Sequence, residues 1–292
     1  MPIPNISFSH QHSKQSELQI FELSELYQRK TLDHDPEQPH RIKFFGIIHI
    51  EDGFGTHMVD FQECQFKVGT VIFFQREQVQ SFDFSNKPQG KVIVFTEGFL
   101  EQIHANMRLP TYAQTHLNID HSPLIQLDKT EHQHIQELVA KLTEETARVD
   151  SNSLIILYLF AALSLSLQRL RPQSVTEAIS KEQSERFSRF FILMQMHFDK
   201  IRDANWYALQ MNITYKTLNQ ACKLTTGLTV KHLIDAFTIL EIKRRLVVYE
   251  TTTQQLANEL GFEDSSNFVK YFKKSVGMTP TQFIQKYRTP TQ

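Results

Sequence analysis

Cysteine is nearly absent from this chain, because Cys64 and Cys222 are the only two in 292 residues. Two cysteines cannot build a disulfide framework, so the sequence favours a reducing compartment. Residues 1–16 lack the charged and then apolar pattern of a secretory signal peptide. The longest apolar run, residues 154–167, is shorter than the roughly 20 residues that cross a bilayer. We therefore expect a cytoplasmic protein with no membrane partner.

Histidines at metal-ligand spacing are also missing from residues 40–100, where we predict the strands of a β domain. Cupin enzymes hold their metal with two histidines one residue apart on a strand, a carboxylate and a third histidine further on. Here His49 and His57 are eight apart, and the His-x-His pairs fall at 132–134, on a predicted helix, and at 10–12, near the N-terminus. We expect no metal, no cofactor and no catalytic residues, with a cupin-type enzyme as the alternative.

Net charge is almost zero over the whole chain, but its two parts differ sharply. Residues 1–185 carry 16 Lys and Arg against 24 Asp and Glu, whereas residues 186–292 carry 15 against 8. A basic segment with a net charge of +7 suits counterion release from nucleic acid phosphates. The charge pattern therefore places a predicted DNA-binding part in the last third.

What the last third does contain is an internal repeat. Leu218, Cys222, Lys223, Gly227, Thr229 and Leu233 recur fifty residues later as Phe268, Phe272, Lys273, Gly277, Thr279 and Phe283. Residues 207–213 correspond to 256–262 at an offset of 49, so the second copy has one extra residue in its turn. Matched packing positions indicate one supersecondary unit built twice, and its pattern is that of a helix-turn-helix.

Each copy has the helix start and stop signals of this motif. In the second copy, Thr253 is a predicted N-cap for a helix over 254–260, Gly261 ends it, and Asp264 or Ser265 can cap a helix over 265–276. In the first copy, Asn212 replaces the glycine between helices over 205–211 and 215–225. A long helix over 230–249 is expected to hold the copies at a fixed separation. If that separation is about one duplex turn, roughly 34 Å, both second helices can enter successive major grooves on one face of the DNA.

The second helix of each copy has an exposed face that is polar and basic. Amide side chains can bond adenine bidentately and lysine can reach guanine. Phosphate contact or simple solvation remains an alternative for each such residue, and an ordinary all-helical bundle remains one for the whole region. The candidate DNA-binding residues are Tyr215, Lys216, Asn219, Gln220, Lys223, Ser265, Ser266, Lys270 and Lys273.

Short motifs in this region resemble the signature of the AraC/XylS transcription regulators. They are Leu256-Ala257, Leu260-Gly261-Phe262, Ser266-Asn267-Phe268, Phe272-Lys273-Lys274 and Gly277-Met278-Thr279-Pro280, followed by Phe283 and Tyr287-Arg288. The resemblance covers residues 187–288 and implies base contacts from the second helices, through Lys216, Asn219 and Gln220 and through Ser265, Ser266 and Lys270. The family usually has an aromatic residue where this chain has Asn267 and a large apolar one at Cys222, so we expect looser packing of both second helices.

The front of the chain has the pattern of a small β-sandwich or barrel. Short runs rich in β-branched and aromatic residues, at 44–50, 55–61, 70–74 and 91–95, alternate with turn signals. The family resemblance implies a cupin-like jelly roll that binds an effector. We expect an α+β multidomain fold, with this barrel and its flanking helices over 1–170, a linker over 171–184, and an all-α tandem helix-turn-helix domain over 185–292.

Thirteen phenylalanines in the first hundred residues favour an apolar barrel interior. Polar groups among them are candidates for effector contacts, since Arg41 can clamp a carboxylate and histidines can orient hydroxyls. The candidates are His40, Arg41, Phe44, His49 and His57, with surface or core roles as the alternative for each. An aromatic or fatty acid is the expected ligand class, by analogy with the family.

Two predicted helices follow, over 129–148 and 153–170, and the second is apolar nearly all round. Such a helix needs cover on two sides, which a symmetric homodimer supplies; burial within one protomer is the alternative. The candidate dimer residues are Leu154, Leu157, Tyr158, Ala161 and Leu165.

These features together predict a sequence-specific transcription regulator, an effector-responsive activator of a nearby catabolic or stress operon. Its expected partners are promoter DNA, a small-molecule effector, RNA polymerase and a second copy of the chain. An effector-independent DNA-binding protein is the remaining alternative, and it would have a barrel packed solid with side chains.

Overall fold

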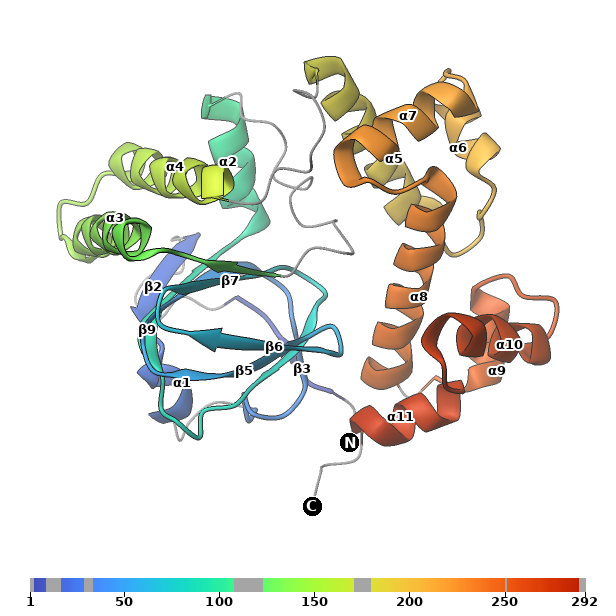
Figure 1. Ribbon diagram of the computed structural model, residues 1–292, viewed down its shortest axis with the longest axis horizontal. Helices are drawn as coiled ribbons and strands as arrows, with labels where there is room; N and C mark the ends of the chain where they lie inside the picture. The colour runs from blue at the N-terminus through green and yellow to red at the C-terminus, as the bar shows by residue number, and fades with distance from the viewer. Residues whose placement is uncertain are drawn as a thin grey trace. The chain divides into compact units, whose positions relative to one another are not determined.

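The computed structural model describes residues 3–8, 17–28, 34–107, 123–170, 180–249 and 251–288. These residues fall into two compact units, one rich in strands and one helical (Figure 1). The predicted fold class, a β domain with flanking helices followed by an all-α domain, is confirmed. Residues 171–179 of the expected linker lie outside the described residues, and residues 181–184 are helical rather than linker, because Ser180 caps the helix that follows.

The strand-rich unit contains two five-stranded sheets, ordered β1-β3-β8-β5-β6 and β10-β7-β4-β9-β2. Among the described strands, β1 pairs with β3 in parallel and the other neighbours pair antiparallel. The strands are β1 (Asn5–Ile6), β2 (Leu18–Glu22), β3 (His40–Ile42), β4 (Phe45–Asp52), β5 (Phe54–Val59), β6 (Gln62–Lys67), β7 (Thr70–Phe74), β8 (Val79–Phe82), β9 (Gln89–Phe95) and β10 (Leu124–Gln126).

Turn chemistry sets where these strands end. We expected a strand through Phe61, but β5 stops at Val59 because Asp60 and Phe61 have φ angles of 49° and 69°. Two successive positive φ angles are those of a type I′ hairpin turn, whose twist matches the flanking strands. Val59 accordingly pairs with Gln62 across the two-residue loop.

Aromatic side chains fill the core between the sheets. Phe66, Phe74, Phe82 and Phe84 are all buried in one cluster with aliphatic residues of both sheets. Phe82 and Phe84 stack with their ring centroids 5.3 Å apart. Aromatic rings bury the largest apolar area per residue, so these side chains hold the two sheets together.

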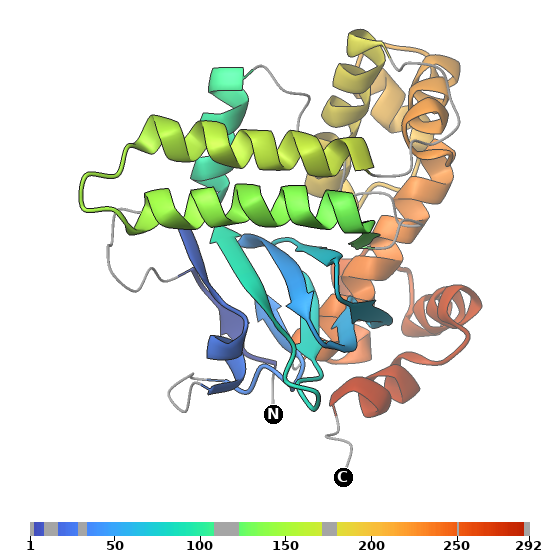
Figure 2. The same ribbon diagram turned by 60° about the vertical axis from the view of Figure 1, so that its left-hand side comes forward.

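Helices cover one side of this unit, with α3 (Lys129–Ala147) and α4 (Ser153–Leu170) lying side by side in an antiparallel hairpin (Figure 2). The shorter helices are α1 (Ser24–Gln28) and α2 (Glu97–Met107). Phe160 anchors α4, with its ring 4.8 Å from Phe95 on β9 and 5.1 Å from Phe99 on α2. Among the described helices, α4 is the one long and apolar enough to cross a membrane by length and composition alone, whereas we expected its apolar run to be too short. Core helices of soluble proteins meet the same criterion.

The helical unit consists of α5 (Lys181–His197), α6 (Ala204–Gln210), α7 (Tyr215–Thr226), α8 (Val230–Val248), α9 (Thr253–Glu259), α10 (Ser265–Val276) and α11 (Pro280–Arg288). The duplicated sequence forms two duplicated turns, since Asn212 and Gly261 both adopt positive φ, at 56° and 68°. Asparagine and glycine tolerate this conformation best, which confirms the expected correspondence between them. One cap was misplaced: Thr252, not Thr253, caps α9 in a capping box.

Candidate functional site

The first candidate DNA-reading helix, α7, begins immediately after its cap. Thr214 accepts a hydrogen bond from the backbone N–H of Thr217, and Leu218 and Cys222 are fully buried on the inner face. Tyr215, Lys216, Gln220 and Lys223 are exposed on the outer face. The helix therefore presents a phenol, an amide and two ammonium groups, which suit bases and phosphates.

Asn219 differs from the other candidates on α7 because its amide is already engaged. Its Oδ1 accepts a hydrogen bond of 3.2 Å from the backbone N–H of Val230, the first residue of α8. Bidentate recognition of adenine requires both the oxygen and the nitrogen of an amide. Asn219 thus ties the middle of α7 to the start of α8, which weighs against its candidacy for base readout.

The second copy needs no side-chain amide to accept a hydrogen bond at the corresponding helix start. Fifty residues after Asn219 and Val230 the chain has Val269 and Pro280. Pro280 is the first residue of α11 and has no N–H, so no acceptor is needed at position 269. The two differences compensate each other.

The second candidate DNA-reading helix, α10, starts at Ser265 after an N-cap by Asp264. Phe268 and Phe272 are fully buried, Ser265 is half-buried, and Ser266, Lys270 and Lys273 are exposed. The expected loosening at Asn267 does not arise, because this residue is exposed and donates its side-chain N–H to Asp264 at 3.1 Å. The exposed face is again short, polar and basic.

A single helix, α8, joins the two motifs (Figure 1). Its 19 residues span about 28 Å at the usual rise per residue. Its buried residues include Leu233, Phe237 and Leu246, so it is the core of the helical unit as well as the spacer. That length is of the same order as one turn of duplex, about 34 Å.

In the strand-rich unit, two of the predicted effector residues face the interior together. His40 on β3 and His57 on β5 both flank β8, where His40 pairs with Gln80 and His57 with Phe82. His57 Nε2 donates to Gln80 Oε1 at 3.2 Å, and its ring stacks on Phe82 with centroids 4.0 Å apart. Its Nδ1 is therefore a buried acceptor with no protein partner.

The predicted residue His49 lies elsewhere, on β4. Its Nε2 is 3.0 Å from His132 Nδ1 on α3, which ties that helix to the sheet. Burial lowers the pKa of His49 and of His40 to about 4 and that of His57 to about 3. These three buried histidines are therefore uncharged near neutral pH. No group of three His, Cys, Asp or Glu side chains within the described ranges is placed to hold a metal ion.

Arg41 and Phe44 do not join the two interior histidines. Side chains alternate along a strand, so Arg41 points to the opposite face of β3 from His40, and there it forms an ion pair with Glu77. Lys43 also contacts Glu77, at 3.0 Å. Phe44 is half-buried and packs edge-on against Phe74, as a core residue does.

The candidate dimer residues on α4 divide into two groups. Leu157 and Ala161 are buried within their own unit, so the structure removes them from any surface. Leu154, Tyr158 and Leu165 are exposed, with Tyr158 at 57%, and Ile155 joins them as an exposed apolar residue. This exposed set is called the α4 apolar face below.

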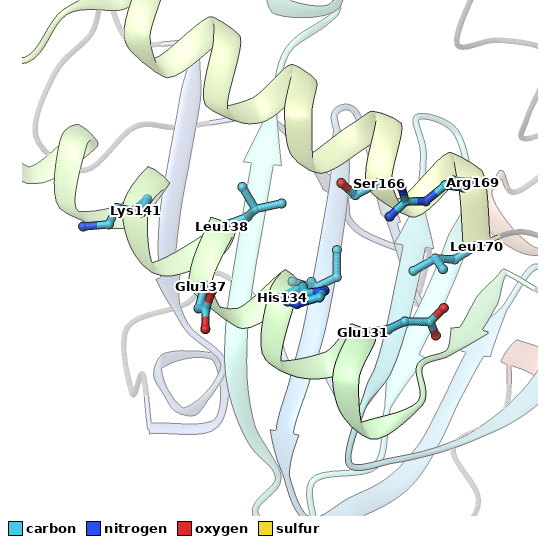
Figure 3. Close-up of a pocket in the computed structure, with 9 residues that line it drawn as sticks. Glu131, His134, Glu137, Leu138, Lys141, Ser166, Arg169 and Leu170 are labelled. Atoms are coloured by element: carbon cyan, nitrogen blue, oxygen red, sulfur yellow. The ribbon is translucent and has the colours of Figure 1, made fainter.

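A groove of about 540 Å³ lies between the outer sides of α3 and α4 (Figure 3). Its lining combines charged side chains of both signs with three aliphatic ones. The lining residues are Glu131, His134, Ile135, Glu137, Leu138 and Lys141 of α3 and Ser166, Arg169 and Leu170 of α4.

Sequence reasoning missed the partners that give several candidates their roles. Gln80, Glu77 and His132 are 23, 36 and 83 residues away from the side chains they contact. Only the Asn219 contact had a signal in the sequence, since comparing the two repeats shows that Val230 becomes Pro280 where Asn219 becomes Val269.

Comparison with known proteins gives consistent matches. A family described as an AraC-like ligand binding domain matches residues 23–161, and a helix-turn-helix domain family matches residues 207–286. The transcriptional activator RhaS of Shigella sonnei (strain Ss046) is 24% identical over 258 residues, covering 86% of this chain and 87% of that protein. RhaS of Escherichia coli (strain K12 / DH10B) matches to the same extent, 24% over 258 residues, with the same 86% and 87% covered.

Among solved structures, ToxT from Vibrio cholerae aligns with a TM-score of 0.45 at 12% identity, covering 94% of this chain and 100% of that one. The C-terminal domain of AraT, a response regulator from Geobacillus stearothermophilus, aligns with a TM-score of 0.34 at 20% identity, covering 39% of this chain and 93% of that one.

The two family matches fall on the strand-rich unit and on the paired helix-turn-helix motifs, respectively. Each therefore agrees with the geometry of the unit that it covers. The chain belongs to the AraC/XylS family of transcription regulators.

Proposed function

We propose that this protein is a cytoplasmic, homodimeric regulator that reads promoter DNA with α7 and α10 together and activates transcription in response to a small molecule. The observation that carries the proposal is the duplicated helix-turn-helix, with matched caps, matched positive-φ turns and two exposed basic faces joined by α8. Two motifs on one spacer suit two successive major grooves on one face of the duplex.

Charge supports the assignment of DNA binding to the helical unit. Residues 186–292 carry 15 basic and 8 acidic residues, whereas the first 185 carry 16 and 24. Lysines on α7 and α10 can displace phosphate counterions, which makes binding fall with salt. The acidic part opposes nonspecific coating of DNA by the whole chain.

The effector would be sensed in the strand-rich unit. His57 offers a buried acceptor nitrogen beside His40 and Gln80, so a ligand with a hydroxyl or N–H donor fits this group. The carboxylate expected from the sequence loses support here, because Arg41 points to the other face of its strand and is paired with Glu77. We propose an effector with an apolar or aromatic body and a hydrogen-bond donor.

The effector-independent alternative is not favoured, because residues 23–161 match an AraC-like ligand binding domain family. Phenylalanines and aliphatic residues pack between the sheets, and Phe82 among them stacks on His57. The groove between α3 and α4 does not replace an interior site, because it is open and four of its nine lining residues are charged.

Regulation would follow from a population shift. An effector that binds one arrangement of the two units more tightly than another increases the population of that arrangement by its difference in affinity. A homodimer formed through the α4 apolar face would bring two helical units to one promoter and set their joint contact with RNA polymerase. No catalytic step is part of this proposal.

Selection of full-length protein on a random duplex library tests DNA reading directly. We expect enrichment of a discrete site, bound roughly 10³-fold or more tightly than scrambled duplex at one stated salt concentration. Equal binding to scrambled duplex would reduce the protein to a nonspecific binder.

A ligand screen on the full chain then tests sensing. Thermal shifts measured with neutral sugars and polyols, phenols, aromatic acids and fatty acids should single out a class that also changes affinity for the selected site. If no class alters either quantity, the effector-independent alternative is correct.

A further inference from the structure

Arg202 connects the two helix-turn-helix motifs through the segment between α5 and α6, in addition to the connection made by α8. It lies in the short segment between α5 and α6, one residue before Asp203, the N-cap of α6. This segment belongs to the first motif, because Tyr207 of α6 donates its O–H to the backbone oxygen of Ile201 at 2.8 Å. Tyr207 is itself fully buried, so the backbone that carries Arg202 is held firmly.

The guanidinium of Arg202 reaches the turn of the second motif. Its Nη2 donates to the backbone oxygen of Leu260, the C-cap residue of α9. Its Cζ lies 3.9 Å from the centroid of the Phe262 ring and 5.4 Å from that of Tyr271. A positive charge at a helix C-terminus satisfies an orphan carbonyl and favours the helix dipole, and the planar group also stacks on the rings.

The far side of this contact is fixed to α8. Tyr271 of α10 donates its O–H to Asp235 Oδ1 of α8 at 3.2 Å, and its ring is 5.4 Å from that of Phe262. Arg202 therefore contacts a turn and a ring that are held in place by the spacer helix. We call Arg202, Leu260, Phe262, Tyr271 and Asp235 the clamp.

The clamp opposes rotation of the second motif about the axis of α8, which packing along α8 alone does not prevent. A body packed along one helix can still rock about that helix axis, and a second contact away from the axis opposes this rocking. Rocking of the second motif would move α10 relative to α7. A shift of one base pair displaces the next groove by about 3.4 Å and rotates it by about a tenth of a turn, so small changes in this angle matter.

We propose that Arg202 is a positioning residue that fixes α10 relative to α7 and so determines which half-site spacing the protein accepts. The inference rests on the proposed DNA-binding function. A residue that served stability alone would change the affinity for all spacings equally. A positioning residue changes the preference among spacings while each half-site sequence stays the same.

The test compares four full-length proteins in selections from the same random duplex library at the same salt concentration. They are the wild type, Arg202→Ala, Arg202→Lys and Lys200→Ala. Arg202→Lys keeps the charge but loses the planar stacking group. Lys200 is exposed in the same segment, so Lys200→Ala is the matched control for removing one positive charge there. Duplexes with one base pair inserted or removed between the half-sites are then titrated against each protein.

For the wild type we expect two half-site motifs at one spacing, with a loss of roughly tenfold for each neighbouring spacing, the size of one lost base contact. Arg202→Ala should enrich the same two motifs over several spacings, within about threefold of one another. Arg202→Lys should be intermediate, and Lys200→Ala should match the wild type.

Retention of the single spacing by Arg202→Ala would overturn the inference. If Arg202→Ala loses the half-site read by α10 because the second motif no longer folds, Arg202→Lys decides, and an unchanged single spacing in that variant overturns the inference equally. Failure of the wild type to enrich any motif would instead refute the proposed DNA-binding function, so the two failures are distinguishable.

Discussion

Exchanging the α7–α8 junction for its counterpart in the second motif is a direct test of what Asn219 does. Asn219→Val removes the acceptor for the backbone N–H of Val230, whose side chain is fully buried. A buried donor left without a partner costs about 1–3 kcal/mol. We expect this variant to lose about 1–2 kcal/mol of unfolding free energy, since the half-buried valine recovers some apolar contact.

The second change, Val230→Pro, should restore what the first removes. Proline has no N–H to satisfy and is favoured at the first position of a helix. The residue before it must be extended, and Thr229 already is, at φ −75° and ψ 157°. We expect the double variant to lie within about 0.5 kcal/mol of the wild type, so Val230→Pro should restore about 1–2 kcal/mol in the Asn219→Val background.

Tryptophan fluorescence can measure the unfolding free energies of these variants in the full chain. Trp206 in α6 is the single tryptophan, so urea unfolding followed by its emission reports on the helical unit. An unaffected Asn219→Val variant, or a double variant no more stable than it, would contradict the structural role. A DNA titration separates the other possibility: a stable double variant that loses about 1–3 kcal/mol on the selected site, and nothing on scrambled duplex, would show that Asn219 reads a base.

The other predictions concern charge, pH and assembly. The pKa values of His40, His49 and His57 lie below the unfolded value of about 6.5, so the unfolded chain binds more protons than the folded one as the pH falls. The unfolding free energy of the strand-rich unit, followed by circular dichroism in urea, should therefore fall from pH 7 to pH 5 by about 2 kcal/mol per histidine. An unfolding free energy that stays constant over this range would contradict the burial of these histidines. Lys270→Ala should weaken binding to the selected site by about 1–3 kcal/mol more than binding to scrambled duplex, whereas equal losses would mean a phosphate contact. Tyr158→Glu on the α4 apolar face should convert the dimer to monomers in analytical ultracentrifugation. Gln168→Glu, which adds the same charge to the same helix, is the control and should leave the dimer intact. A dimer that persists in both variants would place the interface elsewhere.

The turns and inward-facing residues of the repeat could be predicted well, because the same residue types occur at matching positions in both copies. The positive φ angles at Asn212 and Gly261 and the inward pairs on α7 and α10 follow from matched residue types. The observed helix ends in the repeat differ from the expected ones by only a residue or two. The N-cap of α9 is an example, since the neighbouring threonines at 251–253 offer equivalent side chains.

The strand-rich unit was harder to predict, because its strand order depends on pairings between strands that lie far apart in the sequence. Strand β6 has a single fully buried residue, Phe66, among polar neighbours, so it has no clear apolar pattern. His49 could not be assigned without α3, which brings His132 to it from 83 residues away. Arg41 has the chemistry of a carboxylate clamp, but strand alternation and Glu77 direct it away from the interior.

Chemical footprinting of the full-length protein on its selected duplex tests the central claim most directly. Joint reading by α7 and α10 predicts two protected major-groove segments on one face of the DNA, with centres about 10 base pairs apart. A single protected segment, or protection that is the same on scrambled duplex, would contradict the claim that two coupled motifs read the site.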